Sequence, residues 1–369
     1  MIIRSEELKK ICSKILMAVD SNNTSIFTET LSLYTSGKYL YLAVTNREYF
    51  VKIRLDIQEE VEFNATVSAE LFLKLISKIT FETVEFTIKD NFLLVKSNGS
   101  YKLPMIYDGD KLLELPEINI DNVTSTFNVD SAILSSISNY NSRELAKKAV
   151  TTSPVQKMYY IDSSGCITFT SGACVNKFEL PTTIKILVND KIVKLFKLFN
   201  TATVSVTYGE DVLSDDIIQS KLSFKSDDVE LTTILSSDSS LINSVPAEVI
   251  RTRAFDTYDY SVVINTKLLA DAVDRILIFE NNQLASYGSF TFKKDKVTIV
   301  DTANSSSEEL FYENSLAEDL EYNVVFDLYD IKLILSTVKA NYITINFGNH
   351  QAAVLIEDNI YNVIPECVI

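Results

Sequence analysis

The stretch SAELFLKLISKIT at residues 68–80 decides the fold, because related stretches occur at residues 189–200 (NDKIVKLFKLFN) and 327–340 (DLYDIKLILSTVKA). Each begins with a residue that caps helices well. Each carries a Lys-Leu pair in its middle: Lys74-Leu75, Lys194-Leu195 and Lys332-Leu333. Each precedes an alternating strand pattern at the same distance to within one residue, centred on Phe86, Val206 and Ile345. This recurrence predicts three copies of one structural unit.

Each unit is expected to hold two amphipathic helices and several hairpins. Apolar residues recur at helical spacing over six ranges: 5–19, 68–80, 130–148, 189–200, 265–281 and 327–340. Period-2 alternation after the turns at Ser36-Gly37, Ser164-Gly165 and Lys294-Asp295 predicts equivalent hairpins. The predicted fold class is therefore α+β, with two helices against antiparallel sheets in every unit.

The chain of 369 residues is long enough for three domains with separate cores. Polar residues and prolines interrupt the pattern near Pro116–Ser125 and Pro246–Tyr258, which we interpret as linkers. The expected domains are therefore residues 1–120, 126–249 and 257–369.

The composition is that of a soluble globular protein, with 46% hydrophobic and 23% charged residues. No apolar run approaches the roughly 20 residues that span a bilayer, and the first ten residues lack a signal-peptide pattern. None of the four cysteines, Cys12, Cys166, Cys174 and Cys367, forms a CxxC pair. Free thiols in a cytoplasmic protein are expected, and disulfides are the lesser alternative.

The sequence lacks the residues that most classes of catalytic site require. The one histidine, His350, lies in an expected turn and is interpreted as solvated, so His-dependent triads and multi-His metal sites are excluded. Neither phosphate-binding glycine loop is present. We expect no cofactor, no metal and no enzymatic activity; a hydrolase that uses paired carboxylates is the catalytic rival.

The net charge of −16 argues against nucleic acid until the positions of the charges are considered. Basic residues outnumber acidic residues in the expected helices, so the rest of the chain is more acidic than the whole. A polyanion such as DNA can lie along a basic helical surface while an acidic body repels it. The alternative is that lysine is simply a good helix former on a solvated face.

The sequence resembles the bacterial-type DNA polymerase III β subunit, the sliding clamp, over its whole length. The likeness rests on the threefold repeat and on three local matches. Residues 158–161 (MYYI) with 170–175 (TSGACV) resemble the family's Arg-Tyr-Tyr-Leu and Thr-Asp-Gly-His-Arg-Leu segments. Residues 363–369 (VIPECVI) resemble its closing Val-Met-Pro-Met-Arg-Leu, and residues 100–103 (SYKL) resemble the strand that ends its first domain.

The resemblance implies a head-to-tail homodimer that closes into a ring around double-stranded DNA, with helices lining the hole and sheets outside. Such a ring acts by topology, because encircled DNA cannot leave sideways and a tethered polymerase stays near its substrate. DNA binding is expected to be independent of sequence. The implied partners are the replicative polymerase and a clamp loader, each bound through short apolar peptide motifs, and no membrane.

Three groups of site residues follow from the resemblance. The partner-peptide pocket is expected at Ile161, Thr170, Gly172, Cys174, Val175, Val245, Pro246, Val363, Ile364 and Pro365. The DNA-facing residues are expected to be Lys74, Lys78, Tyr159, Tyr160, Lys191, Lys194, Lys197 and Lys332. The dimer interface is expected at Tyr101, Leu103, Ile276 and Leu277. Ordinary core packing is the alternative for the pocket residues and for Ile276 and Leu277.

The sequence also departs from the family, since Ala173-Cys174 stands in place of its His-Arg pair and Glu366-Cys367 in place of its hydrophobic-Arg pair. An altered preference for partner motifs follows. The alternative function is a clamp-like paralogue of phage or plasmid origin, or a repeat scaffold that binds proteins without serving general replication.

Overall fold

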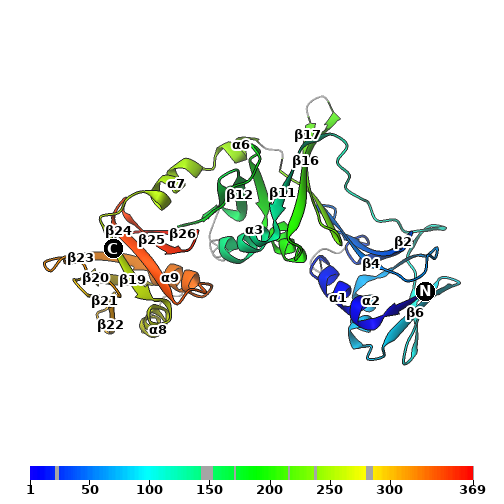
Figure 1. Cartoon of the computed structure of the whole chain (residues 1–369), viewed down its shortest axis with the longest axis horizontal. Helices are drawn as coiled ribbons and strands as arrows, with labels where there is room; N and C mark the ends of the chain where they lie inside the picture. The colour runs from blue at the N-terminus through cyan, green and yellow to red at the C-terminus, as the bar shows by residue number, and fades with distance from the viewer. Residues whose placement is uncertain are drawn as a thin grey trace. The chain divides into compact units, whose positions relative to one another are not determined.

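A computed structural model describes residues 1–20, 25–142, 153–169, 172–214, 217–236, 239–279 and 286–368 (Figure 1). The chain forms two compact units. The first unit combines Met1–Ser135 with Lys191–Ser237, and the second combines Ser136–Asp190 with Asp238–Ile369. Each unit is described by itself below.

The same order of elements occurs three times: one strand, a helix, four strands, a second helix and three strands. In the first repeat these are β1 (Ile2–Arg4), α1 (Ser5–Leu16), β2 (Thr30–Ser36), β3 (Tyr39–Thr45), β4 (Tyr49–Asp56), β5 (Asn64–Ser68), α2 (Ala69–Lys78), β6 (Thr83–Lys89), β7 (Phe92–Lys96) and β8 (Ser100–Pro104). A short hairpin of β9 (Tyr107–Asp108) and β10 (Lys111–Leu112) follows.

The second repeat contains β11 (Val123–Asp130), α3 (Ser131–Ser136), β12 (Met158–Asp162), β13 (Gly165–Phe169), β14 (Ala173–Lys177), β15 (Ile186–Asn189), α5 (Asp190–Leu195), β16 (Thr203–Ser214), β17 (Ile217–Lys225) and β18 (Val229–Ile234). The third contains β19 (Tyr260–Asn265), α8 (Thr266–Leu277), β20 (Tyr287–Phe292), β21 (Lys296–Asp301), β22 (Ser307–Phe311), β23 (Tyr322–Asp327), α9 (Leu328–Leu335), β24 (Tyr342–Asn349), β25 (Ala352–Glu357) and β26 (Ile360–Pro365). Between them lie α6 (Ser239–Asn243) and α7 (Ala247–Phe255). The expectation of an α+β fold built from a repeated unit is confirmed.

Strand pairing also repeats, and all of it is antiparallel. The first strand of each repeat pairs with the sixth, as β1 with β6, β11 with β16 and β19 with β24. The last strand of the second repeat, β18, then pairs with β4 of the first, and β26 of the third pairs with β14 of the second. Each unit therefore contains one eight-stranded sheet that joins two repeats and one four-stranded sheet.

The helices cover one face of the sheets because their apolar residues recur on one side. In α8 the residues Leu269, Ala272, Val273 and Ile276 are buried, and they share one core with strand residues such as Phe290 and Ile299. Asn265 caps α8 and Ser68 caps α2, each accepting a main-chain N–H of the first turn. Capping and periodicity together fix where these helices begin.

Most helices are shorter than the sequence pattern predicts. The range 265–281 yields a helix that ends at Leu277, and 327–340 yields one that ends at Leu335. The range 189–200 forms α5 followed by a 3-10 turn, Phe196–Leu198. The range 130–148 forms α3 and a π-helical turn, Ile137–Asn141, and its second half lies largely outside the described residues. The segment expected to be a linker at residues 246–258 contains the helix α7.

The segment before β11 is fastened to the hairpin of β16 and β17 by a buried ion pair. Lys221 Nζ lies 2.6 Å from Asp211 Oδ2 and also donates to Asn119 O, while Asp211 Oδ1 accepts the N–H of Asn122. Beside it, a Cβ at Gly209 would lie 2.4 Å from Asn122 O, so only glycine permits this approach. The ion pair with Lys221 and the main-chain donors hold the pKa of Asp211 below its ordinary value.

We expect Asp211→Asn to destabilise the protein at neutral pH, because Lys221 would lose its counter-charge. A depressed carboxyl pKa stabilises the fold fully above the unfolded value near ~3.9 and progressively less as pH falls through the folded pKa. The difference between wild type and variant should therefore shrink below about pH 4. Urea unfolding at a series of pH values measures this. Asp110→Asn, an exposed change, serves as the control, and a pH-independent difference would contradict the expectation.

Candidate functional site

The second helix of each repeat presents lysines to solvent, as the Lys-Leu pattern predicts. Lys74 on α2, Lys194 on α5 and Lys332 on α9 are exposed, whereas the leucine after Lys194 is buried and the leucines after Lys74 and Lys332 are half-buried. Lys78, Lys191 and Lys197 are exposed on the same helices or the turn after α5. All six expected DNA-facing lysines therefore lie on the surface.

Three of these lysines form ion pairs with carboxylates of the described residues. Lys74 Nζ lies 2.5 Å from Glu70 Oε1, Lys332 Nζ lies 2.7 Å from Asp274 Oδ1, and Lys191 Nζ lies 2.9 Å from Asp20 Oδ2. The hydrogen bond to Asp20 raises the pKa of Lys191. Lys78 and Lys197 form no ion pair within the part of the chain that the structure describes. The helical surface is consequently less positive than a count of its lysines indicates.

Tyr159 and Tyr160 do not fit the expectation that they face DNA. Both side chains lie on β12 and are buried, with 0% of Tyr159 and 3% of Tyr160 exposed. The Tyr159 hydroxyl donates a hydrogen bond to Asp190 Oδ1 at 3.0 Å, and Tyr160 packs in an apolar cluster. Burial raises the pKa of Tyr160 to about 12. The aromatic pair resembles a surface motif in sequence, but strand β12 lies between β15 and β13 in its sheet, and side chains on both of its faces are buried.

The expected peptide pocket divides between the two faces of the second unit's eight-stranded sheet. Val175, Val245 and Val363 share one apolar cluster, the outer cluster, whose other members include Val155, Tyr160, Ile167, Ala247, Ala254, Ile356 and Tyr361. Cys174 and Ile364 are their chain neighbours and point to the opposite face, because side chains alternate along a strand. Ile364 belongs to the core beneath α8 and α9.

The other expected pocket residues have mixed surroundings. Ile161 is buried, Gly172 and Pro365 are half-buried, and Pro246 is exposed beside Val245. Thr170 lies outside the described residues. The structure therefore brings together Val175, Val245 and Val363 and does not bring Cys174 and Ile364 to the same surface.

Helix α7 forms one wall of the outer cluster, and the sequence analysis missed it. Ala247 and Ala254 pack into the cluster, and the Phe255 ring meets Tyr361 edge-on with centroids 4.8 Å apart. Arg251 fastens the helix to β12 through a 2.6 Å contact with Asp162, both side chains being about nine-tenths buried. No single face of α7 is apolar, so apolar periodicity does not predict this helix. The sequence signal that could have indicated it is Pro246, because proline is common at the start of a helix.

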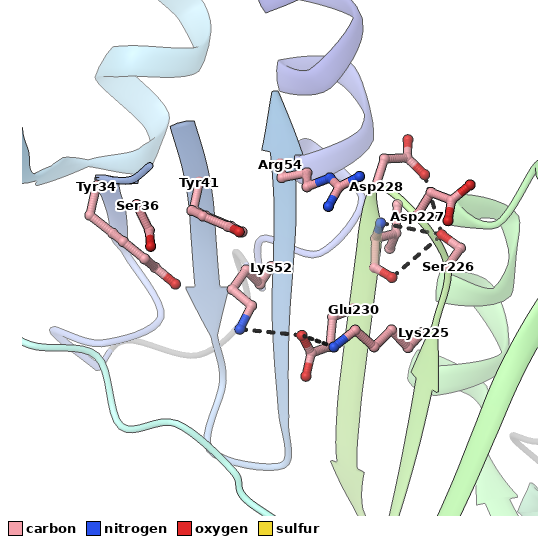
Figure 2. Close-up of a pocket in the computed structure, with 11 residues that line it drawn as sticks. Tyr34, Ser36, Tyr41, Lys52, Arg54, Lys225, Ser226, Asp227, Asp228 and Glu230 are labelled. Carbon is pink, nitrogen blue, oxygen red and sulfur yellow. Dashed lines mark hydrogen bonds and ion pairs between the residues drawn. The ribbon is translucent and has the colours of Figure 1, made fainter. Parts of the chain in front are cut away.

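The matching surface of the first unit is polar. Matched through the strand registers, Lys52, Lys225 and Glu230 stand where Val175, Ile356 and Tyr361 stand in the second unit. Figure 2 shows Lys52 of β4 and Lys225 of β17 both reaching Glu230 of β18, at 3.2 and 3.9 Å. The ring planes of Tyr34 and Tyr41 stack beside them. The repeats thus share a backbone, but one junction carries an apolar cluster packed against α7 and the other carries charged side chains.

Two of the expected interface residues lie on an edge strand, and the other two lie at the end of helix α8. Tyr101 and Leu103 are on β8, which ends one four-stranded sheet, and β22 ends the other. Ile276 is 0% exposed and belongs to the core of its own unit, so it is not available to a partner, and Leu277 is half-buried. The exposed apolar residues are the next two, Ile278 and Phe279, at 75% and 55%. They follow the end of α8, which Arg275 joins to Glu308 of β22 at 2.6 Å.

The remaining chemistry of the described residues is sparse. His350 lies in the turn between β24 and β25, where its Nε2 contacts Asp256 Oδ2 at 2.7 Å, so it is not simply solvated. The four cysteines are free, as expected. Within the described ranges no group of three or more His, Cys, Asp or Glu side chains is placed to hold a metal ion. Over the same ranges, no helix has the length and apolar character that crossing a membrane requires.

Comparison with known proteins identifies the fold. The crystal structure of the DNA polymerase sliding clamp from Bacillus subtilis matches 100% of this chain and 98% of its own, with a TM-score of 0.78 and 15% identity. The DNA polymerase III subunit beta from Pseudomonas aeruginosa matches 100% of both chains, with a TM-score of 0.79 and 14% identity. The chain therefore has the fold of the bacterial DNA polymerase sliding clamp, and the resemblance drawn from the sequence is confirmed at that level.

Sequence comparison gives a shorter match. The beta sliding clamp of Mycoplasmopsis pulmonis (strain UAB CTIP) is 25% identical over 127 residues, which cover 33% of this chain and 31% of that protein. The chain thus spans about a third of the length of this curated relative in the match. No family model matches the chain.

We expect Tyr159→Phe to lower the free energy of unfolding by about 1–2 kcal/mol, because Asp190 would lose a hydrogen-bond donor. The DNA binding that the resemblance implies should not change, since the Tyr159 side chain is buried. Urea unfolding and a DNA-binding titration on the same preparation measure both effects. Lys197→Gln is the matched surface control, with unchanged stability. A loss of DNA binding without a loss of stability in Tyr159→Phe would return this residue to the DNA surface.

Proposed function

We propose that this protein is a sliding clamp: two copies close head to tail around duplex DNA and tether a polymerase and other proteins to it. The observation that carries the proposal is the pair of unfinished sheet edges, β8 and β22. The chain's three repeats, residues 1–120, 126–249 and 257–369, have two junctions within one chain. A third junction of the same kind needs β8 of one copy and β22 of another.

The two internal junctions have the same register. Residues at matched positions on the last strands of the three repeats are Tyr101, Leu231 and Asn362, each reached through the same succession of strand pairs. Leu231 pairs with Val51, and Asn362 pairs with Cys174. The residue that matches Val51 and Cys174 in the third repeat is Ser306, which accepts from Asp301 N just before β22. If a third junction has the same register, Tyr101 pairs with Ser306 of a second copy, and this is the register we propose.

Charge and exposed apolar area support the joining of unlike edges. Strand β8 carries the exposed Lys102, whereas β22 carries Glu308 and Glu309. Two β22 edges side by side would place glutamates against glutamates. Ile278 and Phe279, at the end of the helix that contacts β22, would meet the Tyr101 side of the partner and lose their exposure to water. We propose these two residues as the interface in place of Ile276 and Leu277.

Of the two matched junctions, the one in the second unit suits an apolar partner peptide better. The outer cluster with Val175, Val245 and Val363 lies against α7, whereas the matched surface of the first unit is filled by Lys52, Lys225 and Glu230. Burying those charges under an apolar peptide would require their desolvation. We therefore assign the polymerase and loader motifs to the second unit's surface.

The clamp itself would not be a catalyst. Retention on DNA follows from ring closure, and opening the ring would fall to a loader that supplies its own ATP chemistry. The setting would be the cytoplasm, where reduced thiols such as the buried Cys12 persist.

A paired-cysteine variant tests the register. In a Cys367→Ser background, Tyr101→Cys with Ser306→Cys should give disulfide-linked dimers and closed rings on mild oxidation. Leu231 and Val51 are a non-hydrogen-bonded pair, because the bonds from Arg54 N to Asp228 O and from Ile234 N to Glu48 O fall on alternate pairs. The matched Cα atoms would lie roughly 4.5 Å apart, within the reach of a disulfide.

The mismatched variant, Tyr101→Cys with Phe311→Cys, is the control, because it displaces one thiol along β22. Non-reducing electrophoresis after sedimentation separates monomers from linked dimers. Equal cross-linking in both variants, or none in the first, would contradict the proposed register.

Retention on closed DNA tests the function. Rings locked by the cysteine pair around a circular duplex should stay on it through gel filtration in high salt and should leave when a restriction enzyme linearises it. Binding to circular and linear DNA that is equally lost in salt would count against a clamp and favour the alternative, a repeat scaffold that binds proteins.

A further inference from the structure

The exposed lysines of the helices are not equally free to meet a phosphate. Lys74 is 73% and its partner Glu70 is 70% exposed; Lys332 and its partner Asp274 are 51% and 55% exposed. The pairs recur at matched Lys-Leu positions in the first and third repeats but are built differently. Glu70 lies one turn before Lys74 on α2, whereas Asp274 reaches Lys332 from the neighbouring helix α8. Two different carboxylates thus meet the same repeated lysine.

These two pairs have little structural purpose. Exposed pairs of this kind contribute little to stability, and each carboxylate is solvated without its lysine. The Lys191–Asp20 pair is different, because the Asp20 side chain is only 6% exposed and belongs to a buried network. Of these three pairs, Glu70 and Asp274 can therefore release their lysine without leaving a charge buried, and Asp20 cannot.

We propose that Glu70 and Asp274 are intramolecular competitors of DNA phosphate, which limit the lysine contacts of the proposed clamp and so determine how loosely it holds DNA. The inference rests on the proposed function and concerns the same surface. A phosphate that approaches Lys74 or Lys332 must displace a carboxylate already at hydrogen-bonding distance. It also meets the negative charge of that carboxylate once displaced. Lys78 and Lys197, which form no ion pair within the described residues, supply the remaining attraction.

A clamp gains from such competition because it must be attracted to DNA without being fixed at one position. Every lasting lysine–phosphate contact releases counterions and steepens the dependence of binding on salt. Contacts of equal strength with carboxylate and phosphate leave the lysine free to exchange between them, so the duplex moves without a large barrier. The hydrogen bond with Lys74 lowers the pKa of Glu70, so the competitor is fully charged at neutral pH.

The test is the double variant Glu70→Gln with Asp274→Asn, measured by fluorescence anisotropy with a labelled linear duplex over a series of salt concentrations. Each freed lysine should tighten binding about two- to fivefold at low salt. The slope of log K against log salt should steepen by up to about 0.9 for each freed lysine that contacts DNA. Movement of cysteine-locked rings along a circular duplex should slow in the same variant.

The control is Glu59→Gln with Glu60→Gln, which removes the same charge from an exposed loop between β4 and β5. Unchanged affinity in the control together with tighter binding in the test variant supports the inference. Equal tightening in both variants would mean that only net charge matters and would overturn it, as would no change in either.

Two further measurements separate this inference from a loss of stability and from a failure of the proposed function. Urea unfolding shows whether Glu70→Gln, which removes an acidic residue from the first turn of α2, weakens the helix; the single variant Asp274→Asn then carries the test alone. Cysteine-locked rings that keep Glu70 and Asp274 but leave circular DNA in high salt would overturn the proposed function. Retention of these locked rings, together with affinities unaltered by the carboxylate changes, would overturn only this inference.

Discussion

Main-chain pairing between repeats is the constraint on which the rest of this structure depends. The last strand of a repeat completes the sheet of the preceding repeat, as β18 does with β4 and β26 does with β14. Main-chain hydrogen bonds are indifferent to side chains, so the same junction tolerates a charged surface in one unit and an apolar surface in the other. The architecture and the surface chemistry can therefore vary independently, which explains a TM-score of 0.78 at 15% identity.

The sequence predicted best those features that depend only on neighbouring residues. Capping and helical periodicity gave the starts of α2, α8 and α9, and alternation gave the hairpins. It was less informative where position along an element decides exposure. The buried Ile276 and the exposed Ile278 are only two positions apart, on either side of the end of α8. A pattern of apolar residues does not show where a helix ends, so it could not separate them. The exposed pair Ile278 and Phe279 lay inside the predicted helical range 265–281, whereas the helix ends at Leu277.

Tertiary context explains the remaining differences. Tyr159 and Tyr160 resemble a surface aromatic motif, but they lie on a strand with a neighbour on each side and are buried on both of its faces. Adjacent residues of a strand, such as Cys174 and Val175, point to opposite faces of the sheet and cannot line the same pocket, although a sequence motif groups them together. Helix α7 has no apolar stripe because it packs through small residues and the Arg251–Asp162 pair, which depends on a strand far away in sequence.

The two unlike edges, β8 and β22, have a consequence for the lone chain. In the proposed assembly, pairing between two different edges does not by itself limit how many copies join, and closure requires that successive copies meet at an angle that returns the last edge to the first. A substitution that alters this angle without changing the edge strands would leave an unpaired edge at each end of the assembly. The product would be open filaments that grow with concentration, so loss of closure would be observed as turbidity rather than as a stable monomer.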